Sequence, residues 1–204
     1  MYPTVQNIPG NAGLLLLFRL VRLMLERVRD DMKPPSIPPD IQVPPGNEPF
    51  LEGRGIGTQN YICLPTNAGF DWTFFAPQAT LFEDKIRQII THFLSPNPVE
   101  GATARATWQH SHDSSTVWAM SIASSTDPKF VAPGAIPWLL LKVVGTRPGP
   151  GGGDRLVRTT FIQRLNTSGG IAPSTGCGAP TDLGAKALVP YTANYYFYRP
   201  CDKD

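Results

Sequence analysis

The chain has 204 residues, with 18 Lys and Arg against 16 Asp and Glu, so its formal net charge is +2. This balance, with no run of Lys or Arg, excludes the one-sided positive charge of most nucleic-acid-binding proteins, and we expect no nucleic-acid partner. No stretch approaches the roughly 20 apolar residues that a membrane-spanning helix needs. The first residues also match a secretory signal peptide poorly, because no Lys or Arg precedes the short apolar run.

Residues 11–32 show the spacing of an amphipathic helix, preceded by a possible cap at Asn11 and ended by Pro34 and Pro35. We therefore treat residues 1–33 as a helical extension. Its apolar stripe needs a cover, and we expect self-association or docking of a protein partner through this helix, with a membrane surface as the less favoured alternative. The docking side chains would be Leu14, Leu17, Phe18, Val21, Met24 and Leu25.

Residues 34–49 contain so many prolines that neither a helix nor a central strand is expected there. Such a segment is extended and semi-rigid. We interpret it as a linker, or as a strap that lies over the following domain.

From residue 50 to residue 204 the pattern predicts an all-β domain, because short apolar strands alternate with Gly- and Pro-rich turns. Several short strands of this kind indicate a β-sandwich or a β-barrel. In the last segment Tyr191, Ala193, Tyr195 and Phe197 alternate with a second set of residues, which predicts one buried and one partly covered face. The candidate strands are residues 56–64, 70–75, 79–82, 87–93, 116–123, 136–144, 156–165 and 191–198.

The three cysteines, Cys63, Cys177 and Cys201, include no C-x-x-C pair. This spacing argues against a zinc knuckle and against a thioredoxin-like site. Three thiols allow one disulfide and one free cysteine, or three reduced and mostly buried thiols.

Several segments, in this order, carry a family resemblance. The most characteristic are residues 55–63, residues 135–142 and residues 190–198, together with the stretch from Ile162 to Gly170. Over about residues 40 to 200 the chain resembles the domain-of-unknown-function family DUF3455. Members of this family are typically exported, which implies an extracellular or cell-envelope location. Cys63 and Cys177 both match family positions, so the resemblance implies a disulfide between them.

The sequence His110-Ser111-His112-Asp113 contains the best candidate metal ligands. If these residues formed a strand, His110 and His112 would lie on one face and could share a metal ion with a third ligand from elsewhere. The competing interpretation is a polar turn with two exposed histidines, and we expect no cofactor.

The tryptophans Trp72, Trp108 and Trp138 could line a ligand groove, where aromatic rings stack on a bound molecule. The alternative is that they simply fill the core of a β domain. No nucleotide-binding, nucleophile-elbow or paired-carboxylate motif is present, so we assign no catalytic residues. The preferred function is a non-catalytic binding or structural protein. The alternatives are a metal-dependent enzyme using His110 and His112, and an accessory subunit of a larger assembly.

Overall fold

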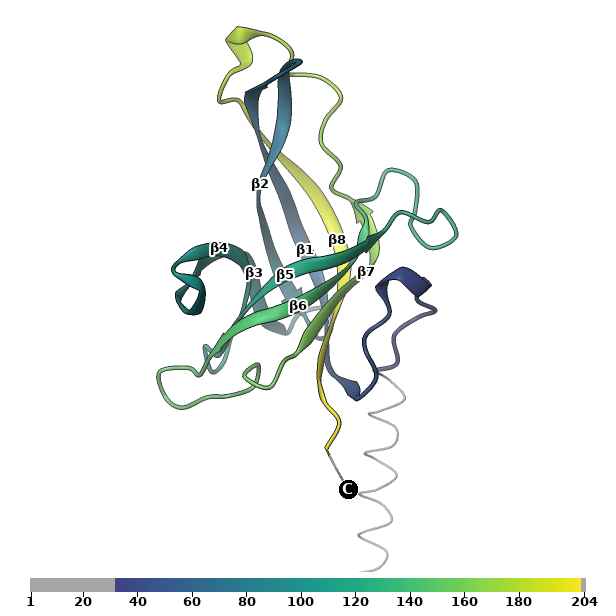
Figure 1. Cartoon of the computed structure of the whole chain (residues 1–204), viewed down its shortest axis with the longest axis vertical. Coiled ribbons are helices and arrows are strands. Elements are labelled where there is room, and N and C mark those ends of the chain that lie inside the picture. The colour runs from purple at the N-terminus through teal and green to yellow at the C-terminus, as the bar shows by residue number, and fades with distance from the viewer. Residues whose placement is uncertain (1–31, 203–204) are drawn as a thin grey trace, which may run out of the picture. The chain divides into compact units, whose positions relative to one another are not determined.

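The computed structural model describes residues 32–202. In this part of the chain eight antiparallel strands form a closed barrel in which each strand pairs with its neighbours in sequence and β1 pairs with β8 (Figure 1). The all-β expectation is confirmed, and the barrel is the correct one of the two predicted architectures. The strands are β1 (Asn47–Thr66), β2 (Gly69–Phe82), β3 (Gln88–Asn97), β4 (Thr103–His110), β5 (Thr116–Ser125), β6 (Trp138–Arg147), β7 (Phe161–Gly169) and β8 (Lys186–Pro200). Three short 3-10 turns are also present, η1 (Pro39–Ile41), η2 (Pro98–Glu100) and η3 (Pro180–Asp182).

Strand β2 joins two segments that the sequence pattern separates at Pro77. It runs through this proline without interruption, and Pro77 is paired with Gln59 of β1. Pairing of β2 with β3 begins only at Ala79, so the other edge of β2 is unpaired at Pro77. A proline is tolerated there because it removes a backbone donor that no neighbouring strand needs.

The inside of the barrel is filled by every second residue of each strand, as the period of a β-strand requires. In β8 the predicted alternation is confirmed: Tyr191, Ala193, Tyr195 and Phe197 belong to the interior cluster of buried residues. The large ring of Tyr195 fits because Gly55 lies beside it; a Cβ atom at Gly55 would come within 2.7 Å of that ring. Four alternate side chains of β8, three aromatic and one small, therefore point into the barrel.

The opposite faces of β6, β7 and β8 are buried as well, in a second cluster that we call the outer cluster. Its fully buried members include Ile41 and Leu165, each 0% exposed. Ile41 comes from the Pro-rich segment, and its carbonyl oxygen accepts a 2.7 Å hydrogen bond from the Nε2 atom of Gln163. This segment is therefore not a free linker: from Pro34 onward the chain forms one compact unit with the barrel, and β1 begins at Asn47, before the expected boundary at residue 50.

The predicted helix over residues 11–32 lies outside the described residues except for Met32, and the same holds for the six side chains proposed for docking. Domain 1–33 therefore remains a prediction from the sequence. Within residues 32–202, no helix has the length and the apolar character needed to cross a membrane.

Candidate functional site

The wall of the barrel is incomplete on both sides of the hairpin formed by β3 and β4. Strand β2 is paired with β3 only as far as His92, and β4 is paired with β5 only from Ala106 onward. The remaining part of this hairpin diverges from both neighbours, and Figure 1 shows β4 curving away from β5. An opening into the barrel is the consequence.

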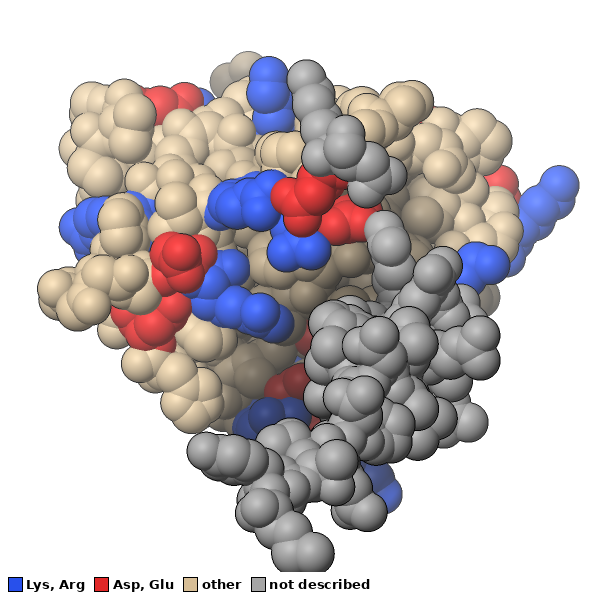
Figure 2. Space-filling model, turned by 90° about the horizontal axis from the view of Figure 1, so that it is seen from below, with Lys and Arg blue, Asp and Glu red and all other residues tan. Residues whose placement is uncertain are grey.

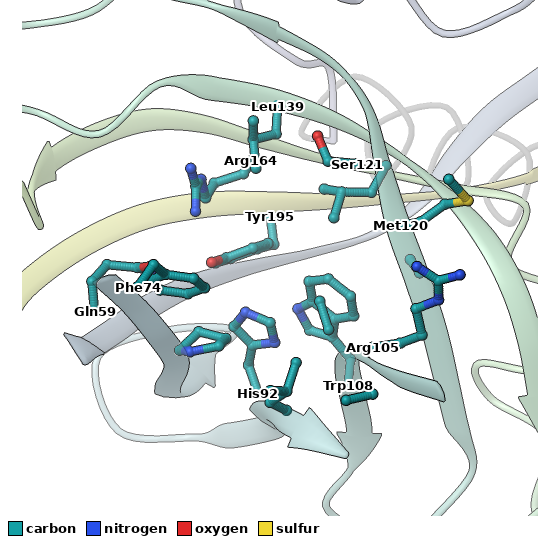
Figure 3. Close-up of a pocket in the computed structure, with 16 residues that line it drawn as sticks. Gln59, Phe74, His92, Arg105, Trp108, Met120, Ser121, Leu139, Arg164 and Tyr195 are labelled. Atoms are coloured by element: carbon teal, nitrogen blue, oxygen red, sulfur yellow. The ribbon is translucent and has the colours of Figure 1, made fainter. Parts of the chain in front are cut away.

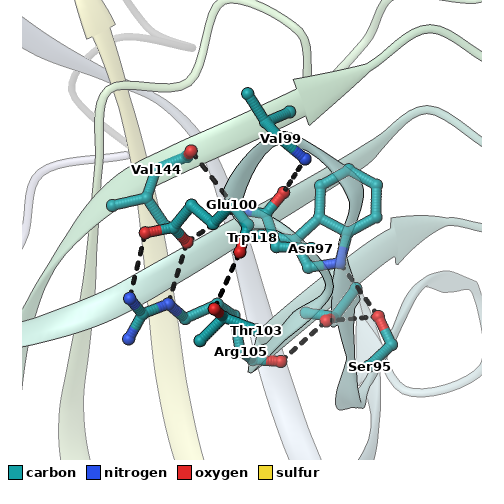
Figure 4. A network of polar contacts seen from close by, with 9 residues as sticks. Ser95, Asn97, Val99, Glu100, Thr103, Arg105, Trp118 and Val144 are labelled. Atoms are coloured by element: carbon teal, nitrogen blue, oxygen red, sulfur yellow. Dashed lines mark hydrogen bonds and ion pairs between the residues drawn. The ribbon is translucent and has the colours of Figure 1, made fainter.

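A polar network holds the end of this hairpin in its curved position (Figure 4). The fully buried Asn97 donates to Glu100 at 2.7 Å and to the carbonyl oxygen of Val144 in β6 at 3.3 Å. Arg105 donates two hydrogen bonds, each 2.9 Å long, to the Glu100 carboxylate. The Trp118 indole donates to the Ser95 hydroxyl at 2.9 Å. These bonds tie the end of the hairpin to β5 and β6 at defined positions.

The barrel encloses a cavity of about 330 Å³ beneath this opening (Figure 3). Every strand contributes at least one side chain to its lining. Representative lining residues, in strand order, are Gln59, Phe74, His92, Trp108, Ala119, Leu141, Arg164 and Tyr195. A cavity of this size, with a mainly apolar lining and a few polar groups, has the general character of a small-molecule site.

His92 is a neutral hydrogen-bonding group at the wall of this cavity. Its Nδ1 atom lies 2.8 Å from the carbonyl oxygen of Thr107, so Nδ1 carries the proton and Nε2 is left as an acceptor. The ring stacks on Trp108 with a centroid distance of 4.2 Å and an interplanar angle of 9°. Burial lowers the pKa of His92 to about 3, because the charged form would be desolvated.

Two tyrosines form a second polar feature of the interior. The hydroxyl groups of Tyr191 and Tyr195 are 2.9 Å apart and share a hydrogen bond. Burial raises the pKa of both phenols, although the positive charge of Arg164 opposes this effect. Both tyrosines are therefore uncharged at neutral pH.

Three N–H donors that line the cavity form no hydrogen bond of normal geometry among residues 32–202: Gln59 Nε2, Trp108 Nε1 and Arg164 Nε. Gln59 and Arg164 lie close enough to the hydroxyls of Tyr191 and Tyr195, respectively, to lower the pKa of those phenols. Gln59 is 4% exposed and Trp108 is 1% exposed, so solvent reaches neither side chain readily. Each unpaired buried donor costs about 1–3 kcal/mol. Such groups are normally satisfied, and their convergence on one cavity indicates a place for a molecule with acceptor atoms.

The two arginines that line the cavity differ in whether a carboxylate neutralises them. Arg105 is neutralised by its ion pair with Glu100. Arg164 donates from Nη2 to the carbonyl oxygen of Pro137 at 2.9 Å, and within the described part of the chain no carboxylate forms an ion pair with it. No Asp or Glu is among the described lining residues. The cavity therefore has one positive charge that no carboxylate among residues 32–202 balances.

The predicted metal ligands lie outside this cavity. His110 Nδ1 is 2.9 Å from an Asp113 oxygen, and the rings of His110 and His112 are 5.8 Å apart. Burial raises the pKa of Asp113, but hydrogen bonds from Arg155 and Ser115 outweigh it and hold that pKa well below its usual range. Between residues 32 and 202, no three His, Cys, Asp or Glu side chains are grouped as a metal site would require. The metal hypothesis remains a prediction.

The three tryptophans proposed for a ligand groove are not brought together. Trp108 lines the cavity, whereas Trp138 belongs to the outer cluster. Trp72 lies near the end of the β1–β2 hairpin, where its indole donates to the carbonyl oxygen of Thr175 at 3.0 Å. Gln59 and Arg164 were missed by the sequence reasoning. The sequence could have indicated Arg164, because it lies two residues after the buried Ile162 and therefore faces the same side of β7.

The implied disulfide is confirmed: Cys63 of β1 is bonded to Cys177 in the segment between β7 and β8, and Cys201 is free and exposed. The bond links points that are 114 residues apart in the sequence. Disulfides of this kind form and persist in oxidising compartments. The chain is therefore suited to such an environment.

These features define the molecule as an up-and-down β-barrel with an internal cavity. The chain belongs to the family described as "Protein of unknown function (DUF3455)", whose model matches residues 44–199. The match spans all eight strands except Pro200, the last residue of β8, and so includes the whole cavity. No curated protein and no solved structure matches the chain.

Proposed function

We propose that this protein is a non-catalytic binding protein that holds one small, largely apolar organic molecule inside its barrel. The observation that carries the proposal is the cavity of about 330 Å³ onto which three buried N–H donors without acceptors converge. A bound molecule with an acceptor group would satisfy these donors and cover the apolar lining.

The size of the barrel supports this proposal. Eight strands leave an interior just wide enough to be filled by side chains or to hold one small ligand. Here the interior is filled at one end by large side chains such as Phe197 and Leu81, both 0% exposed. Small side chains at Ala106 and Ala119 leave space in the region of the opening.

The state of the polar groups favours binding over acid–base catalysis. A histidine with a pKa of about 3 is a poor proton acceptor at neutral pH, because general bases work best with a pKa near the working pH. The buried tyrosines hold their protons for the same reason of desolvation. These groups are suited to positioning a ligand through hydrogen bonds.

An extracellular or cell-envelope location is part of the proposal. It is supported by the disulfide between Cys63 and Cys177, since an oxidising compartment preserves such bonds. On the face seen in Figure 2, basic and acidic side chains lie next to one another. This mixture favours a ligand or protein partner over nucleic acid.

The alternative of a metal-dependent enzyme has less support, because Asp113 already accepts from His110, Ser115 and Arg155. These bonds give Asp113 a structural role in the turn between β4 and β5. The accessory-subunit alternative depends on residues 11–32, and sizing the chain with and without residues 1–33 would test it.

The binding proposal is tested with N-phenyl-1-naphthylamine, an uncharged apolar dye whose fluorescence rises in an apolar environment. We expect saturable binding to the wild-type chain and its loss in Ala106→Trp, which fills the cavity. The control is Ser124→Trp, which adds the same bulk at an exposed position of β5 that does not line the cavity. Absence of saturable binding, or equal binding by both variants, would contradict the proposal.

A further inference from the structure

We infer that the molecule bound in this cavity is an organic monocarboxylate, whose carboxylate is held by Arg164 and Gln59 at one side of the barrel interior. This inference rests on the proposed function, and it specifies the chemical class of the ligand. The feature that carries it is the juxtaposition of an unbalanced guanidinium with unpartnered buried amide and indole donors in one largely apolar cavity.

The charge of the site favours an anion. Of the two arginines that line the cavity, Arg105 is neutralised by Glu100 through two 2.9 Å bonds, and Arg164 has no such partner within residues 32–202. His92 and the interior tyrosines are uncharged at neutral pH. A positive charge that is partly withdrawn from water is stabilised by a counter-charge, so one negative charge would complete this site.

The donors are placed to receive that charge. In Figure 3 the guanidinium of Arg164, the hydroxyl of Tyr195 and the side chain of Gln59 lie at the same side of the cavity, opposite Met120 and Arg105. Neither Arg164 Nε nor Gln59 Nε2 forms a hydrogen bond of normal geometry among residues 32–202, and both side chains lie near tyrosine hydroxyls of the interior. A guanidinium offers a planar pair of donors that matches the two oxygens of a carboxylate.

The rest of the lining indicates the other part of the ligand. Trp108, Leu139 and Leu141 supply flat and branched apolar surface, and no described lining residue carries a negative charge. A phosphate monoester would bring close to two negative charges, whereas the cavity offers a single unbalanced positive one. A carboxylate attached to a short apolar or aromatic body matches both the charge and the lining.

The test compares 4-phenylbutyrate with 4-phenylbutan-1-ol, which share an apolar body and differ in the charged group. Isothermal titration calorimetry at pH 7.5 measures both with the wild-type chain, with Arg164→Met and with Arg54→Met. Arg54 is an exposed arginine of β1 outside the cavity and serves as the matched control. We expect the wild type and Arg54→Met to bind the acid about ten-fold or more tightly than the alcohol.

In Arg164→Met this preference should disappear through weaker binding of the acid, with binding of the alcohol unchanged. If this variant does not fold, Arg164→Lys decides: it keeps the charge but lacks the planar fork, so the preference for the acid should fall several-fold. Equal binding of acid and alcohol by the wild type, binding of neither, or an unchanged preference in the folded Arg164 variant overturns the inference. In those cases retained binding of N-phenyl-1-naphthylamine leaves the proposed function standing, whereas failure of the dye itself removes the proposed function.

Discussion

Strands β6, β7 and β8 bury both of their faces, and the two faces differ in how their polar groups are satisfied. On the outer face Gln163 is 0% exposed; its amide donates to Ile41 and accepts from the Tyr198 hydroxyl. Inside the barrel, Gln59 of the neighbouring strand β1 is almost as buried, yet its Nε2 atom forms no hydrogen bond of normal geometry among residues 32–202. The outer face also has an unpartnered donor, Trp138 Nε1, which is the only such donor there among residues 32–202.

The difference shows that burial by itself does not identify a functional site. The outer cluster is closed by the protein's own chain, because the segment around Ile41 covers it and supplies the missing acceptor. The inner cavity has no such cover among residues 32–202, and its three unpartnered donors lie together. Polar groups that the protein leaves unsatisfied in one place are the better marker of a ligand.

The largest expected effect lies at neither face but at the covalent link between Cys63 and Cys177. Reducing the Cys63–Cys177 bond, or replacing both residues by Ser, should lower the free energy of unfolding by about 3–5 kcal/mol, because a 114-residue loop is released. Urea denaturation with and without reductant measures this loss. Cys201→Ser is the control and should leave the midpoint unchanged, since Cys201 is exposed and free. A similar midpoint for the reduced and oxidised wild type would contradict the prediction.

The interior histidine should make the barrel sensitive to acid. The pKa of His92 is about 3 in the folded state and near 6.5 when unfolded, so between these values the unfolded state binds one more proton. The contribution of His92 to the free energy of unfolding is therefore fully present above pH 6.5, and it falls by about 1.4 kcal/mol per pH unit as the pH drops toward 3. Between pH 6.5 and 3.5 the loss from this residue is about 4 kcal/mol.

Urea unfolding at several pH values checks this dependence. His92→Gln, which keeps a side-chain donor but does not titrate, should flatten the slope by about 1.4 kcal/mol per pH unit in that range. His112→Gln removes an exposed histidine and should leave the slope as in the wild type. If both variants show the wild-type slope, His92 does not stay neutral in the folded barrel.

A substitution at Ile41 tests the packing of the outer cluster. Replacing this fully buried side chain by Ala should destabilise the chain by about 3 kcal/mol, because it opens a void between the Pro-rich segment and the barrel. Ile86→Ala is the control at 88% exposure, with an expected change below about 0.5 kcal/mol. Thermal and urea denaturation measure both. A loss at Ile41 no larger than at Ile86 would mean that the segment does not close the outer face.

The two buried glutamines, Gln163 and Gln59, allow the most direct comparison of the outer cluster with the cavity. Gln163→Leu should destabilise the chain by about 2 kcal/mol, since it leaves the Ile41 carbonyl and the Tyr198 hydroxyl without their partner. Gln59→Leu should instead be neutral or stabilise the ligand-free chain by about 1 kcal/mol, because it removes an amide whose Nε2 forms no hydrogen bond of normal geometry. Urea denaturation of the two variants in parallel gives both values. Equal destabilisation would show that Gln59 is satisfied within the protein.

Local patterns predicted part of the architecture correctly. The alternation of Tyr191 to Phe197 identified the inward face of β8, and the turn residues placed most strand boundaries within a few positions. Strand β4 was not predicted, because small and polar residues such as Ala104 and Thr107 weaken its alternation. Pro77 divided β2 in the sequence pattern, since a proline is compatible with a strand only where a neighbour is absent.

The sequence by itself determined the β class, the inward face of β8 and, through the family positions, the pairing of Cys63 with Cys177. Each of these depends on a residue's own strand period or on a matched motif. Only the tertiary structure decided that the sheet closes and that Gln59, Trp108 and Arg164 meet in one cavity. These three residues come from β1, β4 and β7, and barrel closure depends on the pairing of β1 with β8 and on the register of all the strands, which no local pattern encodes.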